Sequence, residues 1–131
     1  MSNFKVQMSN KVQNPKPQEK YDLGERTARF GEDCIEFAYL LSDSPINRTL
    51  ISQFVRSGTS IGANYMEADG AESKKDFYHK AGLCKKESKE TMHWLRMIAK
   101  ANRSRNDDWR RHWKEDHELT LIFSSIILKS K

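Results

Sequence analysis

A glutamate and a histidine three positions apart form the first pattern in this sequence that could do chemistry. Glu90 and His93 make a Glu-x-x-His pair, which in some four-helix bundles supplies ligands for two metal ions. Such a site needs a second pair on another helix, but the sequence offers only the weaker Asp76 and His79 pair in the same segment. A helical projection also places both histidines away from the predicted core. The sequence therefore predicts no metal site and no cofactor.

Serine, histidine and aspartate are all present, but no nucleophile-elbow motif accompanies them. Gly58 and Gly62 lie within a helical pattern and follow no strand, so they do not form a phosphate-binding loop. The sequence thus predicts that the protein is not an enzyme and has no catalytic residues.

Small and polar residues gather in the run from Arg56 to Phe77, which we interpret as a packing and assembly core. Glycines four apart at 58 and 62 cost about 1 kcal/mol each within a helix, which close approach of another helix would offset. Arg56, Asn64 and Glu67 are predicted to form a buried polar set that fixes the register of the helices, with Glu87 as a partner across the bundle.

Basic residues cluster on one side of the segment 73–100, roughly opposite its core stripe. This basic face is predicted to bind RNA or DNA phosphates without reading the base sequence. The alternative is a solvated surface, which lysine-rich helix faces often are. The predicted nucleic-acid-binding residues are Lys74, Lys75, Tyr78, Lys85, Lys86, Lys89, Arg96 and Lys100.

Four amphipathic helices are expected to position these residues. The first begins at Asp22, a cap paired with Glu25, and breaks at 42–47; the second begins near Asn47 as a cap and ends at Gly70. The third begins at Ser73 and runs to about Lys100, and the fourth spans about 107–129. The predicted core stripes are, in order, Leu23, Thr27, Phe30, Cys34, Phe37 and Leu41; Leu50, Phe54, Ser57, Gly58, Ile61, Tyr65 and Ala68; Phe77, Ala81, Cys84, Ser88, Thr91, Leu95 and Ile98; and Trp109, Trp113, Leu119, Ile122, Phe123, Ile126 and Ile127.

The fold class is therefore all-α, an antiparallel up-down-up-down four-helix bundle over residues 21–131. Residues 1–20 carry a net charge of +3 and contain Pro15 and Pro17, and they are predicted to be a disordered tail, either inert or a weak basic arm. Cys34 and Cys84 fall on core stripes and are expected to be reduced core residues. No signal peptide or membrane span is visible, so we expect a cytoplasmic protein.

Charge is polarised between two helices that would lie diagonally across such a bundle. Residues 22–43 sum to −4 and residues 73–100 to +5, so the unlike faces point away from each other. They cannot pair within one subunit but could pair between subunits, and head-to-tail contacts of unlike patches close into rings. This layout favours a cyclic homo-oligomer; simple solvated faces are the alternative.

The run Arg56–Ala71, followed by Ser73-Lys-Lys-Asp-Phe77 and by Lys86-Glu-Ser-Lys-Glu-Thr-Met-His-Trp-Leu95, resembles a bacterial four-helix-bundle family over residues 21–128. That family includes the proteins encoded in intervening sequences of large-subunit ribosomal RNA genes and the accessory variability determinants of diversity-generating retroelements. The resemblance implies a ring, most often a homopentamer, and for the accessory proteins a nucleic-acid-binding surface and a reverse transcriptase partner. It implies no catalytic residue. The signature polar residues that it carries onto this sequence are Arg56, Ser57, Ser60, Asn64, Glu67, Glu87 and Glu90.

The sequence thus predicts a non-catalytic oligomeric protein that binds nucleic acid through its third helix or serves as an adaptor, with a reverse transcriptase or another protein as partner and no membrane role. The alternative is a protein–protein interaction scaffold with no nucleic-acid role.

Overall fold

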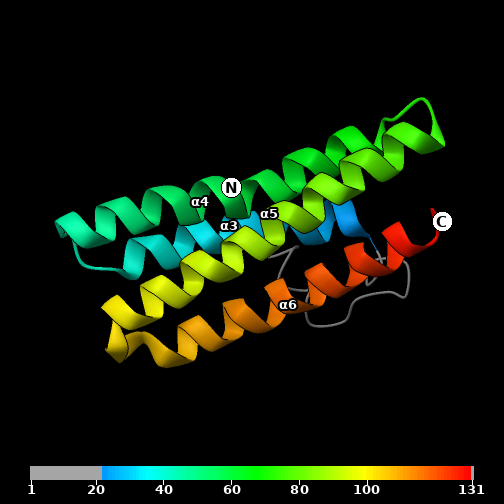
Figure 1. Ribbon diagram of the computed structural model, residues 1–131. Helices are drawn as coiled ribbons and strands as arrows, with labels where there is room; N and C mark the ends of the chain where they lie inside the picture. Colours follow the sequence, from blue (N-terminus) through cyan, green and yellow to red (C-terminus); the bar gives the residue numbers. More distant parts are fainter. Residues whose placement is uncertain (1–21, 131) are drawn as a thin grey trace, which may run out of the picture.

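The computed structural model describes residues 22–130, and in this part of the chain the prediction of an all-α fold is confirmed (Figure 1). The helices are α3 (Leu23–Leu40), α4 (Pro45–Asp69), α5 (Lys74–Ala101), a short 3₁₀ helix η1 (Arg103–Arg105) and α6 (Asn106–Leu128). α4 and α6 each pack against both α3 and α5, so α3 and α5 are diagonal partners across the core. The predicted tail at 1–20 lies outside the described residues.

Side-chain caps explain where the helices begin. The Oδ1 atom of Asp22 accepts a hydrogen bond from the Glu25 amide at 3.1 Å, and Ser73 Oγ accepts one from the Asp76 amide at 3.0 Å, as the sequence predicted. The predicted cap of the second helix was wrong. Ser44 caps α4 and Pro45 follows it, because proline's fixed φ suits the first helical turn.

Asn47, the residue expected to cap α4, is instead buried inside the first turn. Its side-chain Nδ2 donates to the Ser42 carbonyl at 2.8 Å and to Asn102 Oδ1 at 2.9 Å, and Asn102 donates back at the same distance. This amide pair joins the α3–α4 connection to the end of α5, at the same end of the bundle as η1 (Figure 1).

The core follows the predicted stripes closely. Its largest fully buried side chains are Phe30, Phe37, Phe54 and Phe123, and the two cysteines are buried and reduced, as expected. In the second half of α6, Leu119 and Phe123 are fully buried, whereas Leu121 and Leu128 remain 56% and 66% exposed. Within residues 22–130, no helix is long and apolar enough to cross a membrane.

Small residues bring α3 and α4 close together, as the glycine pair predicted. A Cβ atom on Gly62 would lie 3.4 Å from the backbone of Thr27, and one on Gly31 would lie 3.4 Å from Thr59 Cα. At Gly58 the space is already filled, since a Cβ atom there would lie 2.5 Å from Cys34 Sγ. The glycines of α4 are therefore the condition for this close packing.

Gly58→Ala should destabilise the fold even though alanine is the better helix former. The added methyl group would overlap buried Cys34 and approach Phe30, and overpacking of a dense core costs about 1–3 kcal/mol. Gly82→Ala is the matched control, because the methyl group that it adds would have no neighbour within 4 Å, and it should stabilise by up to ~1 kcal/mol. Urea unfolding followed by circular dichroism measures both; equal effects would contradict the close approach.

Candidate functional site

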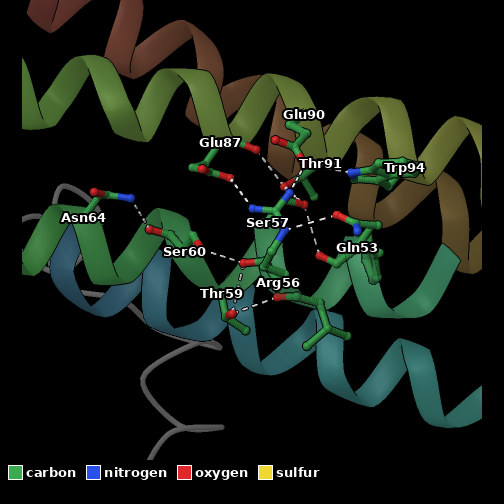
Figure 2. Close-up of polar contacts among 12 residues, drawn as sticks. Gln53, Arg56, Ser57, Thr59, Ser60, Asn64, Glu87, Glu90, Thr91 and Trp94 are labelled. Atoms are coloured by element: carbon green, nitrogen blue, oxygen red, sulfur yellow. Dashed lines mark hydrogen bonds and ion pairs between the residues drawn. The ribbon is translucent and has the colours of Figure 1, made fainter. Parts of the chain in front are cut away.

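A polar seam joins α4 to α5 at the centre of the molecule (Figure 2). The guanidinium group of Arg56, on α4, donates to Glu87 Oε2 at 3.4 Å and to Glu90 Oε2, both on α5. The carboxylate of Glu90 also accepts from Trp94 Nε1 at 2.9 Å. Glu87 is thus the partner of Arg56 across the bundle, as the sequence predicted.

Beneath this ion-pair layer, the seam continues into the core as a hydrogen bond between hydroxyl groups. Ser57 Oγ and Thr91 Oγ1, both fully buried, lie 2.9 Å apart. Thr91 Oγ1 donates to Ser57 Oγ, which in turn donates to the main-chain carbonyl of Phe54, and the Glu87 carbonyl is an alternative acceptor for the Thr91 hydroxyl group. Because this hydrogen bond crosses from α4 to α5 inside the core, it favours one rotation of α5 against α4.

The expected buried polar set was only partly right. Arg56 is 46% exposed at its side chain, so its ion pairs contribute modestly to stability and chiefly to register. Ser60 and Asn64 bind carbonyls of their own helix, at Arg56 and Ser60, because their side chains lie off the contact with α5. Glu67, expected to be buried, is 60% exposed and lies 3.6 Å from Lys80 on α5.

The basic face lies on the outside of α5. Lys74, Lys75, Lys86, Lys89, Arg96 and Lys100 are exposed, while Lys85 and Tyr78 are half-buried. None of these lysines, nor Arg96, forms an ion pair with an acidic residue of the described chain. By contrast, Arg26 and Arg29 on α3 bind Glu115, Glu118 and Glu25. The basic-face residues of α5 are therefore without ion pairs among the described residues, whereas the two arginines of α3 are paired.

The Glu-x-x-His pair is not arranged as a metal site. The Glu90 carboxylate is occupied by Arg56 and Trp94, and His93 is exposed with its ring 4.9 Å from the Trp94 ring. Among residues 22–130 there is no cluster of three or more side chains suited to holding a metal ion.

Two buried titratable residues on α6 were missed by the sequence analysis. Asp116 is fully buried and His112 is 3% exposed, and neither carboxylate oxygen of Asp116 nor Nε2 of His112 has a hydrogen-bond partner among the described residues. The His112 ring stacks on Phe37 at 4.9 Å. Spacing contained the signal: Trp109, His112, Asp116, Leu119 and Phe123 recur at steps of three and four.

Burial shifts the pKa of both groups so as to favour the uncharged form of each. Desolvation, with a smaller effect of Glu115, raises the pKa of the Asp116 carboxyl to about 9. Desolvation, with a smaller effect of Arg111, lowers the pKa of His112 to about 4. Cys34 on α3 faces Asp116, and its own pKa is raised well above the usual value by burial and by that carboxyl. Near neutral pH these groups therefore carry no charge in the folded protein.

These features define a helical-bundle protein in which polar contacts between α4 and α5 accompany a basic outer face of α5. Comparison with known families gives the same class. The sequence profile of the 23S rRNA-intervening sequence protein family matches residues 19–124, and the chain belongs to that family. Among curated proteins, none matches the chain.

A solved structure shares this fold. It is a protein with unknown function from the S23 ribosomal protein family of Bacteroides thetaiotaomicron, 28% identical to this chain with a TM-score of 0.70. The similarity covers 79% of this chain and 96% of that one. The predicted family resemblance is therefore confirmed.

The pH dependence of stability should follow Asp116 above pH 6.5. Between pH 4 and 6.5 the folded protein keeps a proton at Asp116 that the unfolded chain has lost, and it lacks a proton at His112 that the unfolded chain keeps. The two effects on the free energy of unfolding therefore cancel. From about pH 6.5 to 9, Asp116 is the one of these two residues whose protonation differs between the folded and unfolded states, because the folded state keeps a proton that the unfolded state has lost. The free energy of unfolding should then fall by up to about 1.4 kcal/mol per pH unit.

Asp116→Asn should remove this fall while keeping the side-chain volume. The measurement is urea unfolding at pH 5, 6.5 and 8 at one protein concentration. Asp107→Asn, at an exposed position on the same helix, is the control and should behave as wild type. A variant at 116 that still loses stability between pH 6.5 and 8 would show that the carboxyl is not the group responsible.

Proposed function

We propose that this protein is an oligomeric adaptor that binds RNA or DNA phosphates through the basic face of α5. The observation that carries the proposal is the absence of acidic partners for that face within residues 22–130. Unpaired lysines and an arginine along one exposed helix are the electrostatic footprint of a phosphate-binding surface. The names of the family and of its solved relative both refer to the ribosome or its RNA, which agrees with this proposal.

The geometry suits backbone contact rather than base reading. From Lys75 to Lys100 the face extends about 37 Å along the helix at 1.5 Å per residue. Lysine ammonium groups act as point charges toward phosphates and carry no base specificity. Tyr78 is the aromatic residue of the predicted set and offers a ring on which a base can stack.

The proposal includes an antiparallel up-down-up-down bundle that assembles with further copies into a ring, a pentamer by family resemblance. Its support is an apolar groove of about 290 Å³ between α3 and α4, lined by small residues such as Gly31, Gly62 and Ala63 and edged by Ile35 and Met66. Ile35 and Met66 are 40% and 65% exposed. Exposed apolar surface beside small residues is suited to close packing of another helix.

A second copy is the occupant we propose for this groove, because α6 exposes Leu121 and Leu128 on the far side of the bundle from α4. Contacts between unlike faces close into rings. The α5 face would then repeat around the ring, and each repeat would raise the effective concentration of the next. A reverse transcriptase or another nucleic-acid enzyme is the class of protein that such an adaptor would serve.

The alternative function is a protein-interaction scaffold without a nucleic-acid role, and the same apolar groove favours it. Dependence on salt distinguishes the two, because release of counterions from phosphates makes nucleic-acid binding weaken steeply as salt rises.

Replacing Lys86 and Lys89 together by glutamate should abolish binding to RNA and single-stranded DNA, because both ammonium groups are exposed at the middle of the face. Arg110→Glu with Lys114→Glu changes the net charge equally on α6 and should have little effect. Fluorescence anisotropy with labelled oligonucleotides, at 50 and 200 mM salt, measures affinity. No binding by the wild type at low salt, or equal losses in both double variants, would refute the proposed surface.

Ala63→Glu should break the assembly, because it introduces a charge on an exposed position of the groove without touching the core. Size-exclusion chromatography with light scattering should then give a mass near the 15.3 kDa of one chain. Ser52→Glu, on an exposed position of α4 that does not line the groove, is the control and should keep the mass of the wild type. A monomeric wild type would overturn this part of the proposal.

A further inference from the structure

Lysines from two helices meet at one end of the bundle. A hollow of about 500 Å³ is lined by Lys74, Lys75 and Tyr78 at the start of α5 and by Lys129 and Ser130 at the end of α6. Figure 1 shows the start of α5 and the end of α6 at the same end of the bundle. The sequence analysis placed Lys74, Lys75 and Tyr78 on the basic face, but it gave no indication that Lys129 joins them.

The three ammonium groups have no acidic partner in the described chain. Lys74 and Lys75 also lie in the first turn of α5, where the helix dipole disfavours positive charge. Glu72 lines the adjacent hollow, which shares Lys74 and Tyr78, and it is the one acidic residue among those lining the two hollows. Asp76 lies in the same first turn of α5 but forms no ion pair with these lysines. Three like charges therefore line one hollow, and an anion with more than one negative charge would relieve their repulsion.

Tyr78 gives this hollow a second recognition element. Its ring is half-buried and packs edge-on against Phe77, with the ring centres 5.4 Å apart. A ring held in this way can stack on a base, while its hydroxyl group can donate to a phosphate oxygen. The volume is also within the range of small-ligand sites.

The hollow is continuous with the basic face, since Lys74, Lys75 and Tyr78 belong to both. A strand that follows α5 would therefore end here. A terminal phosphate monoester carries up to two negative charges, whereas an internal diester carries one, so three converging lysines favour the terminus.

We propose that this hollow binds the terminal phosphate of a nucleic-acid strand that lies along α5, with Lys74, Lys75 and Lys129 contacting the phosphate and Tyr78 contacting the last nucleotide. This inference rests on the proposed function, because it assigns the end of the same surface. It adds a preference for strands that end in a phosphate group over strands that end in a hydroxyl group. A uniformly basic helix would not show this preference.

The test compares single-stranded RNAs of one sequence that carry a phosphate or a hydroxyl group at the 5′ end, and separately at the 3′ end. We expect one phosphorylated form to bind at least about tenfold more tightly than its hydroxyl counterpart, the size of one charge-assisted hydrogen bond. Lys129→Gln removes a lysine that lines the hollow but does not belong to the α5 face, so it should reduce this preference to about threefold or less and leave binding of the hydroxyl-ended RNA within about threefold. Lys114→Gln, at an exposed position of α6 away from the hollow, is the matched control and should keep the preference.

A second measurement separates failure of this inference from failure of the proposed function. Inorganic phosphate and a nucleoside monophosphate are titrated into the protein, with amide shifts at Lys75 and Tyr78 as the readout. Equal affinity for phosphate-ended and hydroxyl-ended RNA refutes the terminal site while the α5 surface stands. If no RNA binds, the proposed function fails. Shifts with free phosphate alone and no preference among RNAs would reassign the hollow to a small anion and overturn the inference.

Discussion

The rotation of α5 against α4 is the constraint on which the functional surface depends. The buried hydrogen bond between Ser57 and Thr91 favours one register, because a turn of either helix would break this link between α4 and α5 and leave each hydroxyl group only a carbonyl of its own helix. Above it, Arg56 holds Glu87 and Glu90 on the flank of α5. With that flank and the core side fixed, the lysines on the remaining side of α5 must face outward. Glu87 and Glu90 are thereby paired with an arginine of α4 and do not neutralise the lysines of their own helix.

α4 can make this contact because its other side meets α3 through glycines. Gly58 and Gly62 leave no side chain between the two backbones, so Cys34 and Thr27 occupy the space that a larger residue would need. The close packing of α3 on α4 offsets the unfavourable helix propensity of the two glycines. Outside the contact, the same small residues line an apolar groove. One stretch of sequence thus sets the internal packing of α3 on α4 and the character of the surface beside it.

Periodicity predicted the fold well, because core positions in a helical bundle recur regularly and their residue types are mostly apolar. The burial of Phe30, Phe54 and Leu95 was predicted from periodicity and residue type alone. The errors came where polar residues take unexpected environments. Asn47 was read as a cap although its amide pairs with Asn102, a contact between distant segments that spacing cannot show. Asp116 and His112 are buried at positions that fit the stripe of α6, but their polar side chains are of types that are seldom buried without partners, so residue type gave no sign of it. Glu67 was expected to be buried in the bundle, but it is exposed and lies near Lys80.

The basic side chains of α5 and the carboxyl of Asp116 lie in opposite environments, and an unpaired charge is costly only in the second. On α5, the exposed basic side chains without ion pairs in the described chain are solvated by water and accessible to an anionic partner. In the core, the carboxyl of Asp116 avoids the cost of burial by keeping its proton, which makes the fold sensitive to alkaline pH. An assembly that covered the α5 face would have to supply negative charge there, whereas one that used the α3–α4 groove would leave it open. This difference is why we assign the groove to copies of the chain and the basic face to nucleic acid.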